Sequence, residues 1–195
     1  LVVFTGTHLR GLSPLGEPLW KYEYITPYDC NIVTPQLING DLFISSGEDH
    51  GAVRLNITKT ETNYTIKEVW ASQGRTSVMR NEWQTSILSQ GYLFGFDNIG
   101  GAGPITNLHC LNATTGEALW KMPRFGKGNA IAADGKLFIS MMDGNVIIAN
   151  LNKDEYQELG RQQVTRGTRQ APSLSEGLLL LRDDESIYAI DVSGH

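Results

Sequence analysis

The sequence repeats one hairpin signal four times, and this repetition limits the folds that the chain can adopt. At each site a two-residue step ending in glycine comes directly before a short apolar run: Asn39-Gly40 before DLFIS, Gln90-Gly91 before YLFGF, Asp134-Gly135 before KLFIS and Glu176-Gly177 before LLLLR. Such steps favour two-residue hairpin turns, because glycine adopts positive φ without steric cost. The successive glycines are 51, 44 and 42 residues apart, a period typical of four-stranded propeller blades.

The segment 107–151 carries the repeat most fully. Thr115-Gly116 marks a further turn, and the two Asp-Gly steps, Asp134-Gly135 and Asp143-Gly144, both predict type I′ hairpins. Apolar residues along the whole chain either alternate or come in runs of four to six, and no stretch sustains the 3.6-residue period of a helix. The sequence therefore predicts an all-β fold of short antiparallel strands.

Tryptophan supplies a second marker of the repeat. Trp20, Trp70 and Trp120 are fifty residues apart, and in the fourth segment Leu159 takes the corresponding place. An indole buries a large apolar area and its N–H group needs an acceptor, so it suits the interface between two packed blades.

We expect a single β-propeller domain over residues 1–195, with each full blade holding four strands, A to D, counted outward from the axis. The first segment lacks strand A and the last lacks strand D, which leaves three full and two partial blades. A stack of this kind exposes edges that repeat proteins cover. We therefore expect the chain to be the C-terminal part of a ring of seven or eight blades, whose upstream part is its first partner. The expected blades are 1–24, 32–71, 83–122, 128–164 and 170–195.

Composition excludes some partners and leaves the redox state open. The net charge is −5 and no long run of one sign occurs, which argues against a nucleic-acid-binding protein. No apolar stretch approaches the ~20 residues of a membrane-spanning helix. The two cysteines, Cys30 and Cys110, fit either two buried thiols or a disulfide, because spacing alone does not fix the distance between their Cα atoms.

Residues Leu111–Trp120, LNATTGEALW, resemble the Ala-x-Asp-x-x-Thr-Gly-Lys/Glu-x-x-Trp motif of the PQQ-like (quinoprotein-type) β-propeller repeat family. Gly16–Trp20 is a shorter match, and Ser186–Asp191 is similar to the ends of many non-enzymatic bacterial propellers of this kind, such as the BamB-like ones. The resemblance implies that Thr115, Gly116 and the three tryptophans dock one blade on the next. It also implies an extracytoplasmic, periplasmic protein.

The loops that join strand D of one blade to strand A of the next are expected to gather at the mouth of the central channel. Three of these loops, 72–82, 123–129 and 165–170, carry one acidic residue, Glu82, and six basic ones: Arg75, Arg80, Arg124, Lys127, Arg166 and Arg169. The first loop, 25–31, breaks the pattern, with Asp29 and no basic residue. A converging set of cations would suit an anionic ligand such as a tricarboxylate quinone, an acidic glycan or a peptide carboxylate. The alternative is that charged residues simply collect in exposed loops.

No residue pattern predicts catalysis or a metal site. The glycine-rich stretch Asp97–Pro104 is not followed by a helix, so it is interpreted as a loop between strands B and C and not as a phosphate-binding loop. Asp183–Glu185 lacks the alternating ligand spacing of a calcium loop and is interpreted as a solvated turn.

Three functions remain open. The first is a non-enzymatic binding or scaffolding propeller, with a protein or an anionic small molecule as its ligand. The second is a fragment of a PQQ- and Ca²⁺-dependent dehydrogenase, although the adjacent cysteines usual in those enzymes are absent. The third is a glycan-binding or hydrolytic propeller, for which Asp29 and Glu82 are the candidate carboxylates.

Overall fold

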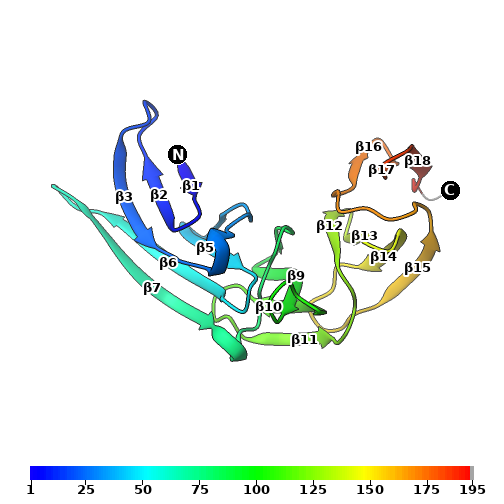
Figure 1. Cartoon of the computed structure of the whole chain (residues 1–195), viewed down its shortest axis with the longest axis horizontal. Helices are drawn as coiled ribbons and strands as arrows, with labels where there is room; N and C mark the ends of the chain where they lie inside the picture. The colour runs from blue at the N-terminus through cyan, green and yellow to red at the C-terminus, as the bar shows by residue number, and fades with distance from the viewer. Residues whose placement is uncertain (194–195) are drawn as a thin grey trace.

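The computed structural model describes residues 1–193, so the last two residues of the fifth predicted blade lie outside the described part. Within it, five antiparallel sheets follow one another in sequence order and form an open arc, with the two ends of the chain on its opposite sides (Figure 1). The strands β3, β7, β11 and β15 run along the convex side of the arc. No helix in residues 1–193 is long and apolar enough to cross a membrane.

Every sheet is built from one continuous segment, with consecutive strands hydrogen-bonded to each other. The first sheet contains β1 (Val2–Phe4), β2 (His8–Leu12) and β3 (Pro18–Glu23). The second contains β4 (Gln36–Ile38), β5 (Asp41–Ser46), β6 (Gly51–Lys59) and β7 (Tyr64–Gln73). The third contains β8 (Ile87–Ser89), β9 (Tyr92–Ile99), β10 (Ile105–Asn112) and β11 (Ala118–Met122).

The fourth sheet contains β12 (Gly128–Ala133), β13 (Lys136–Met141), β14 (Asn145–Asn150) and β15 (Glu158–Gln163). The fifth contains β16 (Ser173–Ser175), β17 (Leu178–Arg182) and β18 (Ile187–Asp191). The predicted fold class is therefore confirmed: three sheets have four strands and the first and last have three. Below, these sheets are called blades 1 to 5.

Four of the five glycine-ending steps have the backbone geometry of a two-residue type I′ hairpin turn. Both central residues have positive φ at all four steps between a first and a second strand, for example 48° at Asp134 and 69° at Gly135. The type I′ prediction for Asp143-Gly144 is wrong, because only Gly144 has positive φ, at 93°. An added Cβ at Gly144 would lie 2.0 Å from the Thr165 carbonyl oxygen, so this glycine is also needed for close backbone approach.

The core lies between the blades as well as within them. One buried cluster joins Phe94 and Leu108 of blade 3 to Leu137, Ile139 and Ile147 of blade 4. Three similar clusters join the other neighbouring blades. Because strand side chains alternate between two faces, each full blade presents one apolar face to each neighbour.

The residue at the tryptophan position of blade 4 differs from the predicted Leu159, because a β-bulge lies in the outermost strand. The pairing of the outermost strand slips by one residue in blades 1 to 4, between Gly11 and Leu12, Arg54 and Leu55, Cys110 and Leu111, and Ile148 and Ala149. Opposite the first residue of each pair lie Trp20, Trp70, Trp120 and Gly160. Glycine therefore takes the tryptophan position in blade 4. The expected substitute, Leu159, is the unpaired bulge residue and is exposed, as Leu119 is in blade 3.

Two further expectations are revised or resolved. The predicted loop Asp97–Pro104 is shorter than expected, because β9 continues through Asp97 and Asn98 to Ile99. Both cysteines are free thiols: Cys110 is buried in the core between blades 3 and 4, and Cys30 is half-buried in a loop. Burial raises the pKa of the Cys110 thiol to about 12, which keeps it protonated and unreactive.

Candidate functional site: the channel mouth

The loops between successive blades, called inter-blade loops here, meet at a cavity of about 230 Å³. Four of them contribute to its wall: Cys30 and Ile32 from the first, Glu82 and Trp83 from the second, Lys127 from the third and Arg169 from the fourth. Glu48 and Ala102, from the hairpins of blades 2 and 3, complete it. This cavity is called the channel-mouth cavity below.

Trp83 is the central side chain of the cavity, because two cations from different loops lie against its indole. The Lys127 Nζ is 5.0 Å and the Arg169 Cζ is 5.3 Å from the ring centroid. Both distances are within the range in which a cation is attracted to the face of an aromatic ring. Sequence reasoning missed Trp83, although a signal was present: it is the one tryptophan of four that breaks the fifty-residue spacing.

Two acids, Glu48 and Glu82, line this cavity, and Glu82 forms an ion pair with one of its two cations. Glu82 Oε2 lies 2.8 Å from Lys127 Nζ, and the Glu82 side chain is only 9% exposed. Lys127 also donates to the Ala102 carbonyl oxygen. Among residues 1–193 no carboxylate lies within 4.0 Å of the Arg169 guanidinium, so Arg169 is the cation of this cavity without an ion-pair partner, while Glu48 in the wall balances its formal charge.

Two polar atoms of this loop are buried without a hydrogen-bond partner among the described residues. They are Oε1 of Glu82 and Nε1 of Trp83. Leaving such a group unpaired costs about 1–3 kcal/mol. Groups of this kind concentrate at functional sites, where the rest of the fold holds them in place.

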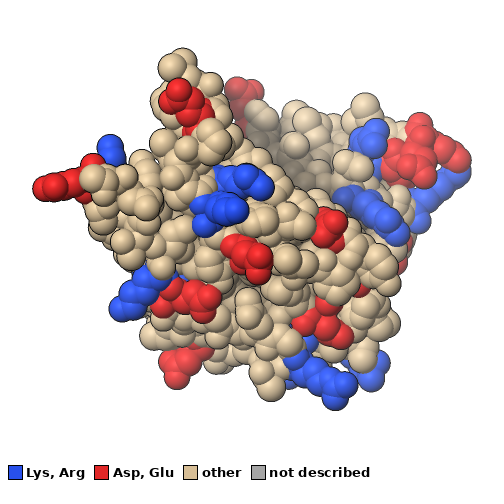
Figure 2. All heavy atoms as spheres, turned by 60° about the vertical axis from the view of Figure 1, so that its left-hand side comes forward, with Lys and Arg blue, Asp and Glu red and all other residues tan. Residues whose placement is uncertain are grey.

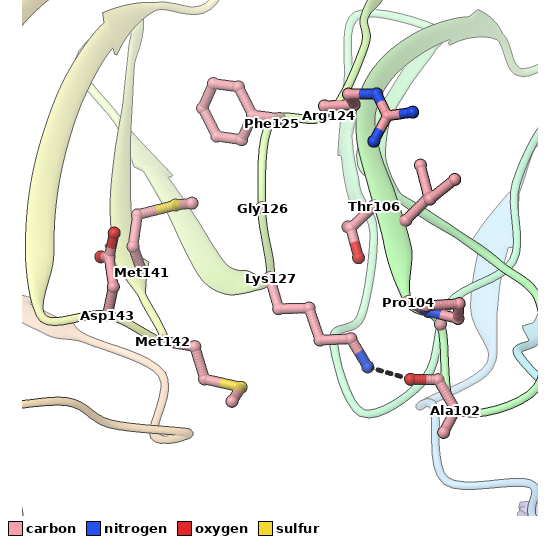
Figure 3. A pocket seen from close by; sticks show the side chains of 12 residues that line it. Ala102, Pro104, Thr106, Arg124, Phe125, Gly126, Lys127, Met141, Met142 and Asp143 are labelled. Carbon is pink, nitrogen blue, oxygen red and sulfur yellow. Dashed lines mark hydrogen bonds between the residues drawn. The ribbon is translucent and has the colours of Figure 1, made fainter.

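A second and larger hollow, of about 520 Å³, adjoins the channel-mouth cavity between blades 3 and 4. Figure 3 shows Lys127 reaching across it toward Ala102, with Met141 and Met142 of blade 4 on the opposite wall. Lys127 and Ala102 line both spaces. The two hollows are therefore parts of one surface, separated by the Lys127 side chain.

The structure does not bring all six predicted basic residues together. Lys127 and Arg169 line the channel-mouth cavity, and Arg124 lines only the hollow between blades 3 and 4. Arg75 is exposed in the short 3₁₀ turn Gly74–Thr76 that follows β7, and Arg166 is exposed and paired with Glu185. Arg80 is 2% exposed and binds Asp97, so a ligand at the surface does not reach it.

Charge of both signs is interspersed elsewhere on the surface. On the face in Figure 2, Lys and Arg side chains lie beside Asp and Glu side chains, with no extended field of one sign. The channel-mouth cavity follows the same pattern, because Lys127 and Arg169 share its lining with Glu48 and Glu82.

Arg80 belongs to a buried cluster below the second inter-blade loop. Its Nε and Nη2 donate to the two carboxylate oxygens of Asp97 at 2.7 and 2.8 Å, and Nη2 also donates to the Ser77 carbonyl oxygen. His109 Nε2 lies 3.8 Å from Asp97 Oδ2. The cluster ties the loop that carries Trp83 to β9 and β10.

His109 predicts a pH dependence of stability. Burial lowers its pKa, with Lys121 and Arg80 adding to the effect and Asp97 opposing it. An unfolded histidine binds a proton near pH ~6.5, whereas folded His109 binds it only at lower pH. The free energy of unfolding should therefore fall as the pH drops below about 6.5, because the unfolded chain then binds more protons.

Urea unfolding between pH 7.5 and 5 checks this expectation. His109→Leu should flatten the curve in this range, and an unchanged slope would contradict the assignment. Burial lowers the pKa of His50 as well, so His50→Gln serves as the matched comparison that removes the second contribution.

The predicted docking residues lie at the boundaries between blades. Trp70 Nε1 donates to the Ala113 carbonyl oxygen of blade 3 at 3.2 Å, and Trp120 Nε1 donates to the Asn152 carbonyl oxygen of blade 4 at 3.0 Å. Trp20 packs with the cluster between blades 1 and 2. Gly116 has a φ of 77° and touches the Trp70 indole so closely that an added Cβ would lie 2.8 Å from the ring.

Thr115 and Asp29 lie in exposed turns, whereas Asp183 is a buried turn residue. Thr115 accepts from the Glu117 N–H in the turn beside Gly116. Asp29 is exposed, lies against Gly6 and does not line the channel-mouth cavity. Asp183 accepts the backbone N–H groups of Arg166, Glu185 and Ser186, and these bonds lower its pKa to about 2.

Comparison with known proteins identifies longer proteins that share this fold. No family model and no curated protein matches the sequence. Solved structures do match. BamB from Moraxella catarrhalis aligns with a TM-score of 0.63 at 16% identity, over 94% of this chain and 52% of that one. A quinohemoprotein alcohol dehydrogenase from Pseudomonas putida HK5 aligns with a TM-score of 0.63 at 13% identity, over 96% of this chain and 38% of that one.

AztD from Citrobacter koseri also matches, with a TM-score of 0.57 at 12% identity over 96% of this chain and 50% of that one. The chain thus spans about half the length of BamB and AztD and less of the dehydrogenase. Identities this low are evidence of a shared fold alone. The resemblance read from the repeat motif is confirmed at that level: the chain has the fold of the PQQ-like β-propellers.

Proposed function

We propose that this chain is part of a non-enzymatic, extracytoplasmic β-propeller that acts as a binding or scaffolding module and holds an anionic group in its channel-mouth cavity. One observation carries the proposal: Lys127 and Arg169, from two different inter-blade loops, meet beside Trp83. The extracytoplasmic location is supported by the resemblance of residues 111–120 to the PQQ-like repeat motif.

Arg169 is the residue that selects for an anion. Lys127 is neutralised by Glu82, whereas Arg169 has an exposed guanidinium without a carboxylate partner in the described chain. A guanidinium presents a planar fork of donors that fits a carboxylate in a bidentate manner. The Trp83 indole and Ile32 add an apolar wall, so the cavity suits a compact carboxylate or the carboxylate end of a peptide.

The expected result is that Arg169→Gln weakens binding of citrate, used as a compact polycarboxylate probe, by roughly tenfold or more. A charge-assisted hydrogen bond contributes about 1.5–3 kcal/mol, and about 1.4 kcal/mol corresponds to tenfold. Isothermal titration at low ionic strength measures the effect. Arg75→Gln is the matched control, because Arg75 is an exposed arginine of another inter-blade loop and does not line the cavity.

Equal loss in both variants would mean that citrate responds only to the net charge, and no loss in Arg169→Gln would refute the proposed site. Titration with PQQ and Ca²⁺ examines the dehydrogenase alternative. Residues 1–193 do not fit that cofactor set: no group of three or more His, Cys, Asp and Glu in this range could hold a metal ion, and Cys30 and Cys110 are not adjacent.

A further inference from the structure

The boundary between blades 4 and 5 differs from the three earlier boundaries in one residue. In blades 1 to 3 the residue after the bulge in the outermost strand is a tryptophan, and in blade 4 it is Gly160. Trp70 and Trp120 both extend across the boundary to a carbonyl oxygen of the next blade. At the fourth boundary this bridge is missing.

An open cavity of about 290 Å³ lies at the position that an indole would fill. Gly160 and Val164 of blade 4 line it together with Leu179, Ile190 and Val192 of blade 5. Val146 and Ile148 of β14 also contribute, and Arg161 and Gln162 of β15 complete the lining, so the wall is apolar apart from these two side chains. Leu179 is fully buried at its base. The cavity therefore has the chemistry of the boundaries that hold tryptophan, without the side chain.

Gly160 is not required by the backbone or by neighbouring atoms. Its φ is not positive, and an added Cβ would meet no atom within 4 Å. By contrast, Gly116 and Gly144 would both collide if they carried a side chain. The space at Gly160 is thus a property of this boundary and not a consequence of a tight turn.

The register of blade 5 also points to a hydrogen-bond acceptor for an indole. One backbone hydrogen bond recurs in blades 3, 4 and 5, from the residue just after the third strand to the glycine of the first hairpin turn. The donors and acceptors are Ala113 and Gly91, Leu151 and Gly135, and Val192 and Gly177. In this register Val192 corresponds to Ala113, whose carbonyl oxygen accepts from Trp70. Ser193 corresponds to Asn152, whose carbonyl oxygen accepts from Trp120. The cavity therefore has a mainly aliphatic wall, polar side chains in Arg161 and Gln162, and by this register a backbone acceptor at its edge.

We propose that the cavity between blades 4 and 5 binds a small molecule with a bicyclic aromatic ring and one N–H donor, of the indole class. The ring would lie over Leu179 and Ile190 of blade 5, just as the Trp120 indole lies against blade 4. Cavities lined by aliphatic side chains bind small aromatic rings. The site is separate from the channel mouth and does not depend on the proposed anion site.

The experiment compares the wild-type protein with Gly160→Trp, using indole at millimolar concentration as the probe. Saturation-transfer NMR should detect indole on the wild type and lose the signal in Gly160→Trp, whose own side chain fills the cavity. That variant should also melt higher by at least about 2–4 °C. Gly160→Ser is the matched control, because it adds a small side chain and should retain indole binding.

Trp120→Gly provides a second check, since it should open the same kind of cavity between blades 3 and 4 and gain an indole signal. Absence of indole binding to the wild type would overturn the proposal, and so would equal binding to Gly160→Trp. Binding of N-acetyl-tryptophanamide without binding of indole would also overturn it, since the occupant would then be a partner's side chain.

Discussion

Asp97→Ala should lower the free energy of unfolding by about 3 kcal/mol, the lower end of the range for breaking a buried ion pair, because the buried Arg80 guanidinium loses its bidentate partner and keeps only Asp49, 3.6 Å away. Arg80 is 2% and Asp97 1% exposed, and both carboxylate oxygens accept from the guanidinium. Urea unfolding followed by circular dichroism measures the change. The loop that carries Trp83 is tied to β9 by this pair, so the variant should also lose the channel-mouth site.

Asp154→Ala is the control for this prediction. Asp154 also forms an ion pair, with Lys153, but both side chains are well exposed. Exposed pairs contribute about 0–1 kcal/mol, so the two aspartates should differ severalfold in their effect. A similarly small loss of stability in both variants would contradict the prediction, because it would mean that solvent replaces Asp97 at the Arg80 guanidinium.

Trp70→Ala should lower the free energy of unfolding by about 3 kcal/mol, the lower end of the range for a large aromatic side chain in a core, because the indole is partly buried. The indole packs against the cluster between blades 2 and 3, lies over Gly116 and donates to the Ala113 carbonyl oxygen. Its removal therefore leaves a cavity and one unpaired acceptor at a boundary between blades. Thermal or urea unfolding measures the loss.

Two companion variants separate the contributions of packing and hydrogen bonding. Trp70→Phe keeps most of the apolar area and loses the N–H donor, so it should cost less, about 0.5–1.5 kcal/mol for the hydrogen bond plus a small cavity term. Val69→Ala changes the exposed bulge residue beside it and should have an effect within about 1 kcal/mol. If Trp70→Ala matched Val69→Ala, the proposed docking role would be wrong.

Much of the fold could be predicted because its signals are local. The positive φ values at Asn39-Gly40 and Asp134-Gly135 follow from residue types that tolerate them, and the apolar runs after them become β5 and β13. The departure of Asp143-Gly144 from type I′ geometry was not predictable from the dipeptide, because Gly144 makes a close contact with Thr165, twenty-one residues away.

The candidate site was predicted less well, for a physical reason. A list of basic residues in loops carries no information about which of them are buried or paired. Arg80 and Arg169 look alike in the sequence, yet one is paired with Asp97 in the interior and the other lies exposed on Trp83. The pairing partner of Arg80 lies in a strand that had been assigned to a loop.

The sequence by itself determined the class of fold, the number of strands in each blade and the places of the hairpins, because periodicity and turn chemistry act over a few residues. Only the tertiary structure decided which cations meet at Trp83 and that Gly160, not Leu159, follows Trp120 in the series. Both depend on register: a one-residue bulge moves every later side chain to the other face of its strand, and no local pattern records where that bulge falls.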